Sequence, residues 1–297
     1  MKNKIVIITG LTGTGKSGLA VEVAEQHNGE IISADSVQIY KKLNIGSAKV
    51  TADEVHNIKH YLLDIKEFNE TYNVNEFVQD CMAAIKIIVS KGKLPIICGG
   101  TGLYIKSLIE GYTFGESANL EFRQKYQKLA EEKGNDYVWQ KLNEISPEKA
   151  KAVHPNNLKR VIRYLELASC NVEPQKAISP LKDFDVCCVG IIAEREDIYK
   201  KLNLRVEQMI EAGLEQEVVN LVKLGAKREM QAFNSIGYRE WFDYFEGKTT
   251  KQQTIDLIKQ HNRNYCKRQL TLLKIIPGIK LLKKEQAKEE IERFLDD

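Results

Sequence analysis

Short runs of apolar and β-branched residues recur along the chain and give the first indication of its fold. They lie at residues 4–9, 30–34, 94–98 and 186–192, with a weaker run at 60–65. Continuous apolar runs of this length are typical of strands buried on both faces of a parallel sheet. Helical patterns occupy the intervals between them. The alternation therefore predicts an α/β fold with a parallel sheet flanked by helices.

Helical periodicity is clearest in four places outside the runs. Residues 75–90 form an amphipathic pattern whose predicted inward face carries Phe77, Val78, Cys81, Ala84, Ile85 and Ile88. Further helices are predicted at residues 103–110, at 194–212 with Gly213 as the stop, and at 251–274. For the helix at 251–274, the candidates for the buried side are Ile255, Ile258, Tyr265 and Leu273. The terminal residues 283–297 read as a mixed-charge helix.

The stretch from residue 119 to residue 169 has a different character, because it is charged and helical and shows no strand pattern. Ser146 and Pro147 predict a helix start, with the serine as cap and the proline at the first helical position. Two prolines mark residues 171–183 as a linker. We therefore expect a core domain made of residues 1–115 and 181–297, and an all-helical insertion domain at residues 116–180.

The length and the composition of the chain narrow the class of protein. A chain of 297 residues with 43% hydrophobic content can bury a core, and no stretch approaches the length of a membrane span. The six cysteines form no C-x-x-C pair, which predicts free buried thiols in a reducing cytoplasm. His56 and His60 have the spacing of helical metal ligands, but no third ligand completes a zinc site.

The run at residues 4–9 leads directly into a glycine-rich stretch that matches the phosphate-loop pattern at every fixed position. This stretch consists of Gly10, Leu11, Thr12, Gly13, Thr14, Gly15, Lys16 and Ser17. Its glycines let backbone N–H groups turn inward, and the following helix adds the positive end of its dipole. Lys16 supplies a charge for phosphate oxygens, and the Ser17 hydroxyl is placed to hold Mg²⁺. A chance turn is disfavoured, because a strand precedes and a helix follows.

Polar residues follow two further predicted strands. Asp35 comes after the run at residues 30–34, and ligands of open parallel sheets bind beyond the carboxyl ends of the strands. Its carboxylate can accept a proton or orient a substrate group, and the alternative is an ordinary loop aspartate. The run at residues 94–98 ends in glycines and Thr101, where many phosphate-loop proteins carry a Mg²⁺-binding aspartate. Small residues allow a substrate to approach the backbone closely, although a plain turn also explains the glycines.

Basic residues gather late in the chain, although the net charge is only +3. Residues 248–284 hold ten Lys or Arg and one acidic residue. A basic stripe on one predicted helix consists of Lys259, Arg263 and Lys267, with Arg268 beside it. A group able to stack on or clamp exposed bases consists of Gly237, Tyr238 and Arg239. Such a run is usually a solvated face, but the imbalance makes an anionic partner worth testing.

Together these blocks resemble the tRNA dimethylallyltransferases, also called tRNA isopentenyltransferases or the IPP transferase family, over nearly the whole chain. The matching blocks are the phosphate loop and residues 35–40, 44–49, 99–104, 154–163, 236–238 and 267–269. The phosphate loop alone is unspecific, whereas residues 35–40 followed by residues 99–104 are highly specific. Departures from the family pattern are Asn44 for Asp, Ser47 for Thr, Lys201 for Arg and Leu272 for Trp. The Lys201 change leaves open which cation meets the diphosphate, and Leu272 weakens any stacking contact there.

The resemblance implies a phosphate-loop fold like that of nucleotide kinases and a prenyl transfer. The family moves a dimethylallyl group from dimethylallyl diphosphate to N6 of the adenosine 3′ of the anticodon (position 37) in tRNA. The loop would hold the diphosphate as a leaving group. Asp35 would then accept the N6 proton and Thr101 would position the nucleophile. Lys16, Arg205 and Mg²⁺ on Ser17 would neutralise the departing diphosphate.

The resemblance also implies how the tRNA anticodon stem-loop is held. The expected contacts are Asp35, Ser36, Val37, Gln38 and Thr101, then Arg123, Lys159, Arg160, Val161, Ile162 and Arg163 in the insertion, and Gly237, Tyr238, Arg239, Arg263, Lys267 and Arg268. We expect a cytoplasmic monomer without membrane contact, and adventitious binding of ATP to the loop stays open. Two other hypotheses also stay open, a small-molecule or nucleoside kinase and a non-catalytic RNA-binding module.

Overall fold

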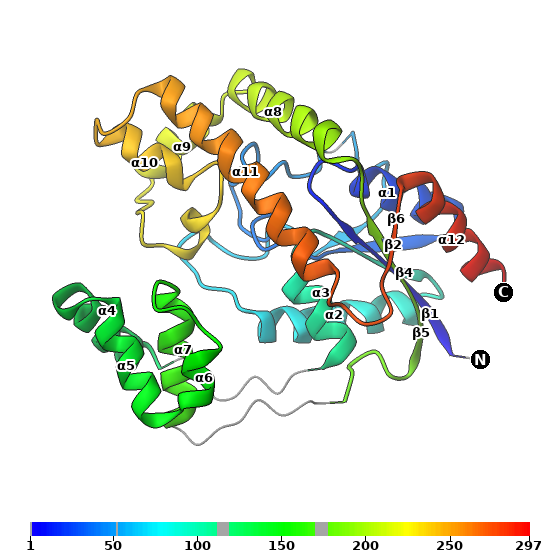
Figure 1. The fold of residues 1–297 in the computed structure, drawn as a ribbon. Coiled ribbons are helices and arrows are strands. Elements are labelled where there is room, and N and C mark those ends of the chain that lie inside the picture. Colours follow the sequence, from blue (N-terminus) through cyan, green and yellow to red (C-terminus); the bar gives the residue numbers. More distant parts are fainter. Residues whose placement is uncertain (1, 52, 112–118, 170–177) are drawn as a thin grey trace. The chain divides into compact units, whose positions relative to one another are not determined.

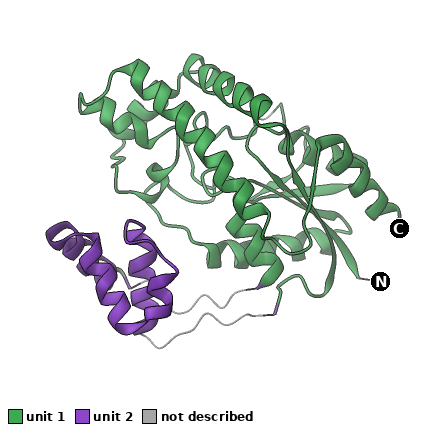
Figure 2. Ribbon diagram, in the orientation of Figure 1, with its two compact units in different colours: residues 1–110, 179–297 green, residues 111–178 purple. Residues whose placement is uncertain are grey.

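The computed structural model describes residues 2–51, 53–111, 119–169 and 178–297, which form two compact units (Figure 2). Unit 1 consists of Met1–Glu110 and Ser179–Asp297, and unit 2 consists of Gly111–Ile178. The boundaries expected for the helical insertion lie a few residues from those of unit 2. Five free cysteines are buried in the described residues, whereas Cys170 and much of the expected linker lie outside them.

Unit 1 is built on a six-stranded parallel sheet in the order β3-β2-β4-β1-β5-β6 (Figure 1). The strands are β1 (Asn3–Gly10), β2 (Gly29–Ser33), β3 (His60–Tyr61), β4 (Leu94–Cys98), β5 (Phe184–Ile191) and β6 (Lys280–Leu282). The predicted parallel α/β fold is confirmed. β6 was not predicted, because three residues are too few to show a pattern, and β3 is shorter than the run at 60–65.

Helices cover both faces of the sheet, since successive side chains of a strand point to opposite faces. On β1, Val6 and Ile8 pack in one cluster with α1 (Lys16–Gln26) and α12 (Lys284–Asp296). Ile5 and Ile7 belong to a larger cluster on the other face. That cluster includes side chains of α2 (Val74–Ser90), α3 (Gly102–Glu110), α8 (Arg195–Glu211), α9 (Leu214–Lys223), α10 (Arg239–Phe245) and α11 (Lys251–Leu273). A short 3-10 helix, η1 (Gln231–Asn234), precedes α10.

Helix α11 buries a partly different face from the predicted one. Ile258 and Leu273 are buried as expected, but Ile255 and Tyr265 are only half-buried. Their places are taken by Thr254, Cys266 and Gln269, which are buried. The polar pair is tolerated there because each side chain is hydrogen-bonded, Thr254 to the carbonyl of Thr250 and Gln269 to the phosphate loop and Gly100.

Unit 2 is all-helical in its described residues. Its helices are α4 (Leu120–Lys133), α5 (Asn135–Ile145), α6 (Pro147–Lys151) and α7 (Leu158–Ser169). Pro147 occupies the first position of α6 as predicted, but the Ser146 side chain makes no capping hydrogen bond. The small core of unit 2 includes Val138, Leu142, Val161 and Leu165. Across both units, no described helix combines the length and apolar composition that a bilayer crossing requires.

Candidate active site

The phosphate loop has the backbone that its glycines predict. β1 ends at Gly10, where an added Cβ would lie 2.3 Å from the carbonyl oxygen of Ile191, so no side chain fits. Gly15 caps α1 with φ of 82°, in the left-handed region that glycine adopts most easily. The Thr14 hydroxyl donates to the Leu11 carbonyl at 2.8 Å and closes the turn. The loop thus leads into the N-terminus of α1, where phosphates bind in such folds.

Lys16 is a cation with little water around it. Its side chain is half-buried, and Nζ donates to the Leu11 carbonyl oxygen at 2.7 Å. Burial lowers the pKa of Lys16 to about 8, with a smaller contribution from the charge of Arg205. The amine is therefore mostly protonated at neutral pH and has a neutral carbonyl rather than a carboxylate as its partner. Phosphate oxygens would supply the missing negative charge.

The buried side chain of Gln269 links the phosphate loop to Gly100, which follows β4, the strand beside β1 in the sheet. Gln269 Oε1 accepts from the N–H and the hydroxyl of Thr12, at 3.0 and 3.1 Å. Its Nε2 donates to the Gly100 carbonyl at 3.1 Å, where an added Cβ on Gly100 would lie 2.7 Å from Nε2. A side chain on Gly100 would therefore require the Gln269 amide to move from this position. In the sequence, the only indication of a role for Gln269 is that it belongs to the 267–269 block that matches the family.

Asp35 and Thr101 meet because β2 and β4 are neighbours and both end at this edge of the sheet. Asp35 Oδ1 accepts from the N–H groups of Val37 and Gln38 at 2.9 and 3.3 Å. Oδ2 has no hydrogen-bond partner among the described residues. Thr101 Oγ1 accepts from the Ser36 N–H at 3.1 Å, and the Thr101 N–H donates to the Ala34 carbonyl at 3.2 Å. The turn therefore fixes the carboxylate while leaving one oxygen free.

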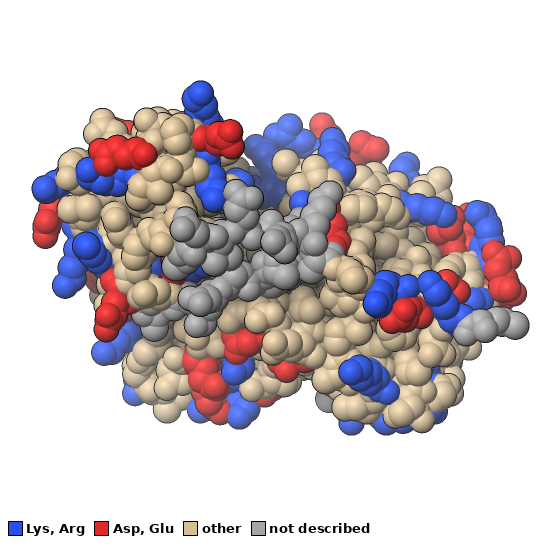
Figure 3. Space-filling view, turned by 90° about the horizontal axis from the view of Figure 1, so that it is seen from below, with Lys and Arg blue, Asp and Glu red and all other residues tan. Residues whose placement is uncertain are grey.

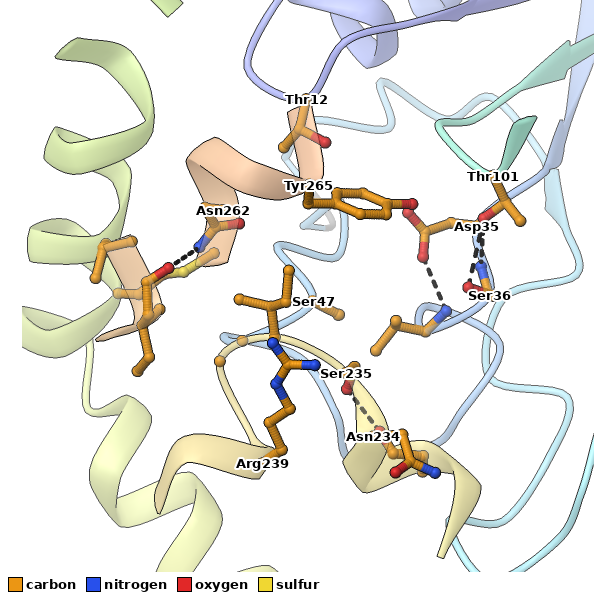
Figure 4. A pocket seen from close by; sticks show the side chains of 18 of the residues that line it. Thr12, Asp35, Ser36, Ser47, Thr101, Asn234, Ser235, Arg239, Asn262 and Tyr265 are labelled. Atoms are coloured by element: carbon orange, nitrogen blue, oxygen red, sulfur yellow. Dashed lines mark hydrogen bonds between the residues drawn. The ribbon is translucent and has the colours of Figure 1, made fainter. Parts of the chain in front are cut away.

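A cavity of about 340 Å³ joins this edge to the phosphate loop (Figure 4). Its lining brings together nine predicted site residues: Thr12, Asp35, Ser36, Val37, Thr101, Arg205, Gly237, Arg239 and Arg268. In Figure 4, Asp35, Ser36 and Thr101 lie on one side and Arg239 lies across from them. The volume is that of a small-ligand site. Asn262 and Tyr265 also line it and were not predicted as site residues.

Arg205 supplies an unpaired cation to this cavity. Its side chain is half-buried and has no hydrogen bond or ion pair with any described residue. Burial lowers the pKa of its guanidinium, and the charge of Asp35 opposes this shift. Lys201, the residue that departs from the family pattern, is exposed one turn earlier on α8. The desolvated arginine is thus the stronger candidate for binding an anion.

Tyr265 lies beside Asp35, with its oxygen directed toward the carboxylate in Figure 4. Burial, followed by the charge of Asp35, raises the pKa of Tyr265 to about 12. The phenol therefore keeps its proton at neutral pH and is a hydrogen-bond donor at this end of the cavity.

The far wall of the cavity depends on Glu217 of α9. Its carboxylate accepts from the N–H groups of Asn44, Ile45 and Gly46 at 2.9–3.2 Å, and from the Tyr238 hydroxyl at 2.7 Å. The Tyr238 side chain is 0% exposed. The expectation that this ring stacks on a base is therefore wrong for the structure described, because the ring packs inside unit 1 and its hydroxyl anchors Glu217.

A second buried carboxylate holds the neighbouring residues. Glu240 accepts from the Gly237 N–H at 2.8 Å, from Arg239 Nε at 2.8 Å and from His261 Nδ1 at 2.6 Å. It is 3% exposed, so burial strengthens these interactions. Glu240 thereby orients Arg239 at the cavity lining. Sequence reasoning identified Gly237 and Arg239 but not the carboxylate that positions them.

The basic stripe of α11 is only partly free. Lys259 pairs with Glu207 at 2.8 Å, and Arg263 donates to the Asn203 side chain at 2.8 Å. Lys267 and Arg268 are exposed and form no ion pair with a described residue. On the face shown in Figure 3, acidic and basic side chains are interspersed. Of the predicted basic stripe, Lys267 and Arg268 therefore remain as exposed cations without an ion-pair partner among the described residues.

The predicted contacts in unit 2 separate into three kinds. Lys159 and Arg160 are exposed on α7. Arg123 and Arg163 are bound to the buried Glu166, at 2.7 and 2.6 Å. Val161 and Ile162 have their side chains buried in the unit's core, so these side chains are not available to tRNA in this conformation, and a contact of these two residues with tRNA stays a prediction. Their helical spacing places them on the inward face of α7.

The residues around Ser17 fit a magnesium ion that is held by few protein groups and mainly by water and the phosphates of a bound diphosphate. Ser17 is exposed in the first turn of α1. It also lines a second cavity, of about 20 Å³, together with Ser33, whose buried hydroxyl has no partner. No cluster of three His, Cys, Asp or Glu that could hold a metal exists among the described residues. Mg²⁺ commonly keeps several waters and binds through few protein ligands plus phosphates, which suits such a site.

Fold and site together define a phosphate-loop protein with a carboxylate facing the loop across a cavity. Residues 38–275 match the family described as IPP transferase, so the chain belongs to the IPP transferase family. It is 44% identical to the tRNA dimethylallyltransferase of Bacillus cytotoxicus, over 91% of this chain and 87% of that protein. It is 43% identical to that of Caldanaerobacter subterraneus subsp. tengcongensis, over 94% of this chain and 91% of the other.

Solved structures agree with this assignment. The full-length tRNA isopentenylpyrophosphate transferase of Bacillus halodurans aligns with a TM-score of 0.74 at 35% identity, covering 99% of this chain and 96% of that one. A eukaryotic dimethylallyltransferase acting on tRNA aligns with a TM-score of 0.75 at 25% identity, covering 99% of this chain and 77% of that one. The family resemblance inferred from the motifs is confirmed.

Proposed function

We propose that this protein transfers the dimethylallyl group of dimethylallyl diphosphate to N6 of the adenosine 3′ of the tRNA anticodon (position 37). The observation that carries the proposal is the shared cavity, which Thr12 of the phosphate loop, Asp35, Thr101 and Arg205 all line. A diphosphate on the loop and an adenine reaching Asp35 would meet there. Relatives named tRNA dimethylallyltransferase support the choice of substrates.

The residues would have three kinds of role in the reaction: one acts as a base, two are cations that bind the diphosphate, and one orients the attacking nitrogen. As N6 attacks the allylic carbon, a bond from nitrogen to carbon forms and the bond from carbon to the diphosphate oxygen breaks. The N6 proton passes to Asp35, whose Oδ2 is free while Oδ1 is fixed by two backbone N–H groups. Lys16 and Arg205 bind the diphosphate as its charge increases. Thr101 is placed beside Asp35 to orient N6.

Mg²⁺ would be held by the Ser17 hydroxyl and would supply further neutralisation of the diphosphate. A kinase is less well supported, because β4 ends at Cys98 and continues into Gly99 and Gly100 without a carboxylate. We further propose that the protein acts as a cytoplasmic monomer. Five buried free thiols among the described residues suit a reducing compartment.

The test is to incubate the protein with labelled dimethylallyl diphosphate and undermodified tRNA, and in parallel with labelled ATP. Label from the diphosphate should enter the RNA, and no phosphoryl group should be transferred. In Asp35→Ala the single-turnover rate should fall by about 10³-fold, the order expected for loss of a general base, while tRNA affinity changes only a few-fold. Absence of label in the RNA would overturn the proposal, and unchanged turnover in Asp35→Ala would remove Asp35 as the base.

The proposed tRNA surface has its own test in Lys267. Its exposed amine has no ion-pair partner among the described residues, so its substitution removes a charge without exposing another one. Lys267→Ala should weaken tRNA binding and reduce the slope of log affinity against log salt by about one unit. Lys86→Ala, which removes an exposed lysine of α2, is the matched control and should leave the slope unchanged. If the unsubstituted protein, Lys267→Ala and Lys86→Ala all have the same slope, tRNA phosphates do not contact Lys267.

A further inference from the structure

A buried hydroxyl near the phosphate loop has no partner in the reaction described above. Ser33 is the last residue of β2, it is 5% exposed, and its Oγ forms no hydrogen bond with the described residues. Buried polar atoms of proteins almost always have a partner, either in the protein or in an ordered water or ion. The Ser33 hydroxyl therefore indicates a bound species in its surroundings.

The space beside Ser33 is the right size for one water molecule. The second cavity, of about 20 Å³, is lined by Ser33, Ser17, Gln38, His60 and Cys98 among others. A cavity that holds one water needs about 10–15 Å³ and two or more polar partners. The Gln38 amide nitrogen already donates to the Ser47 and Ala48 carbonyls, so Gln38 brings its oxygen as an acceptor. The site is both roomy and polar enough for a bound water.

The charge states of the other lining groups are compatible with a neutral water rather than with an anion. His60 Nδ1 faces the Ile58 carbonyl at 2.9 Å and so carries a proton, which leaves Nε2 as an acceptor. Burial lowers the pKa of His60 and raises the pKa of the Cys98 thiol to about 11, so both groups are neutral at pH 7. Among the described residues, no charged side chain lines this cavity.

Ser17 connects this water to the proposed metal. Its hydroxyl is the metal-ligating group of the phosphate-loop pattern, and it lines the same small cavity as Ser33. β4 ends at Cys98 and supplies no carboxylate that could hold the metal's waters, so the neighbouring strand β2 is the next element able to do so. Ligands of the second coordination sphere orient those of the first and tune metal affinity.

We propose that Ser33 binds a water molecule coordinated to the Mg²⁺ on Ser17. The metal-bound water donates to Ser33 Oγ, and the Ser33 proton is available to an acceptor of the cavity, either Gln38 Oε1 or His60 Nε2. Ser33 thus takes the role that a strand-end aspartate has in many other phosphate-loop proteins, without adding a negative charge beside the diphosphate. The inference rests on the proposed function, because it concerns the metal that would accompany the diphosphate.

The experiment measures binding of inorganic diphosphate by calorimetry over a series of Mg²⁺ concentrations. In Ser33→Ala, the Mg²⁺ concentration that gives half of the metal-dependent gain in affinity should rise about tenfold. Diphosphate affinity without metal should stay as in the unsubstituted protein, which also shows that the variant is folded. Ser107→Ala is the matched control, because Ser107 is 1% exposed and its hydroxyl is equally unpartnered, but it lies on α3 and does not line this cavity.

The outcomes separate the inference from the proposed function. If Ser33→Ala and Ser107→Ala both respond to Mg²⁺ like the unsubstituted protein, Ser33 binds only a structural water and the inference is wrong. If the unsubstituted protein itself binds diphosphate independently of Mg²⁺, the inference falls together with the proposed metal. Prenyl transfer to tRNA is assayed separately, so its absence beside a selective Ser33→Ala effect would overturn the function and leave the role of Ser33 intact.

Discussion

The two units use arginine in opposite ways. In unit 2, Glu166 is 4% exposed and binds Arg123 and Arg163, at 2.7 and 2.6 Å, together with the backbone N–H of Asn119. In unit 1, Arg205 is half-buried at the cavity lining and has no carboxylate partner among the described residues. The first arrangement satisfies its charges internally, whereas the second leaves a charge unsatisfied.

The difference distinguishes a structural cation from a ligand-binding one. A desolvated, unpaired guanidinium carries an energetic cost that the free protein bears and that a bound anion removes. A guanidinium that already binds a buried carboxylate can still contact a phosphate, but it must share its donors. Arg205 is therefore a stronger candidate than Arg123 or Arg163 for a contact that matters in the transition state.

The largest effect that tests this comparison is expected from Arg205→Ala. Loss of a charge that stabilises the departing diphosphate should lower the single-turnover rate by about 10²- to 10³-fold. The free energy of unfolding should stay the same or rise slightly, because no internal partner is lost. Rapid-quench measurement of the prenylated RNA and denaturant unfolding check the two halves of the prediction.

Two control variants sharpen this result. Lys201→Ala removes the exposed cation one turn earlier and should change the rate only a few-fold. Arg163→Ala should leave the rate at saturating tRNA nearly unchanged while reducing the stability of unit 2. Equal losses of rate in Arg205→Ala and Arg163→Ala would show that Arg205 and Arg163 do not differ as a ligand-binding and a structural arginine.

Much of the fold and part of the site follow from local sequence. Buried parallel strands such as β1 and β4 are continuous apolar runs, and the phosphate loop has a fixed spacing. Asp35 and Thr101 could be placed together because each follows a strand, and parallel strands end at one edge of a sheet. These inferences need only the order of residues over short distances.

The rest of the site depends on contacts between residues far apart in the sequence. Gln269 reaches Thr12 across 257 residues, and Glu217 reaches Asn44 across 173. A polar residue on a helix shows no pattern that reveals such a partner. Tyr238 was misassigned for the same reason, since its place beside Gly237 suggested a base-stacking ring while Glu217 of a distant helix fixes it inside the protein.

A smaller effect is expected in unit 2 from Glu166→Gln, which keeps the side chain's shape and removes its charge. Removing one partner of a buried ion pair costs about 3–5 kcal/mol, but both arginines are partly exposed, so we expect about 2 kcal/mol. Hydrogen exchange of unit 2 amides should show this loss, with unit 1 unchanged. Glu144→Gln, which removes an exposed partner of Lys141, is the control and should cost less than about 0.5 kcal/mol.

The same ion pairs should respond to acid. Burial by itself would raise the pKa of Glu166, but the hydrogen bonds from Arg123 and Arg163 outweigh it and hold the pKa below its ordinary value. The stabilisation is therefore present at neutral pH and is lost as the pH falls through the lowered pKa. If the hydrogen-exchange protection of unit 2 at neutral pH is the same in Glu166→Gln as in the unsubstituted protein, these arginines are not structural.

The smallest effect concerns Lys16, a second cation beside the cavity of unit 1 whose hydrogen-bond partner is a carbonyl rather than a carboxylate. Its pKa of about 8 means that the ammonium loses its proton as the pH rises through 8, and diphosphate binds the protonated form. Diphosphate affinity relative to that of Lys16→Met should therefore fall about tenfold between about pH 7 and about pH 9, as the protonated fraction falls. The ratio of the unsubstituted protein to Arg205→Ala should change much less over this range, because a guanidinium remains charged and Arg205 makes only a smaller contribution to the lowered pKa of Lys16. Comparing ratios cancels the ionisation of diphosphate itself, and a constant Lys16→Met ratio would show that Lys16 does not bind diphosphate through its charge.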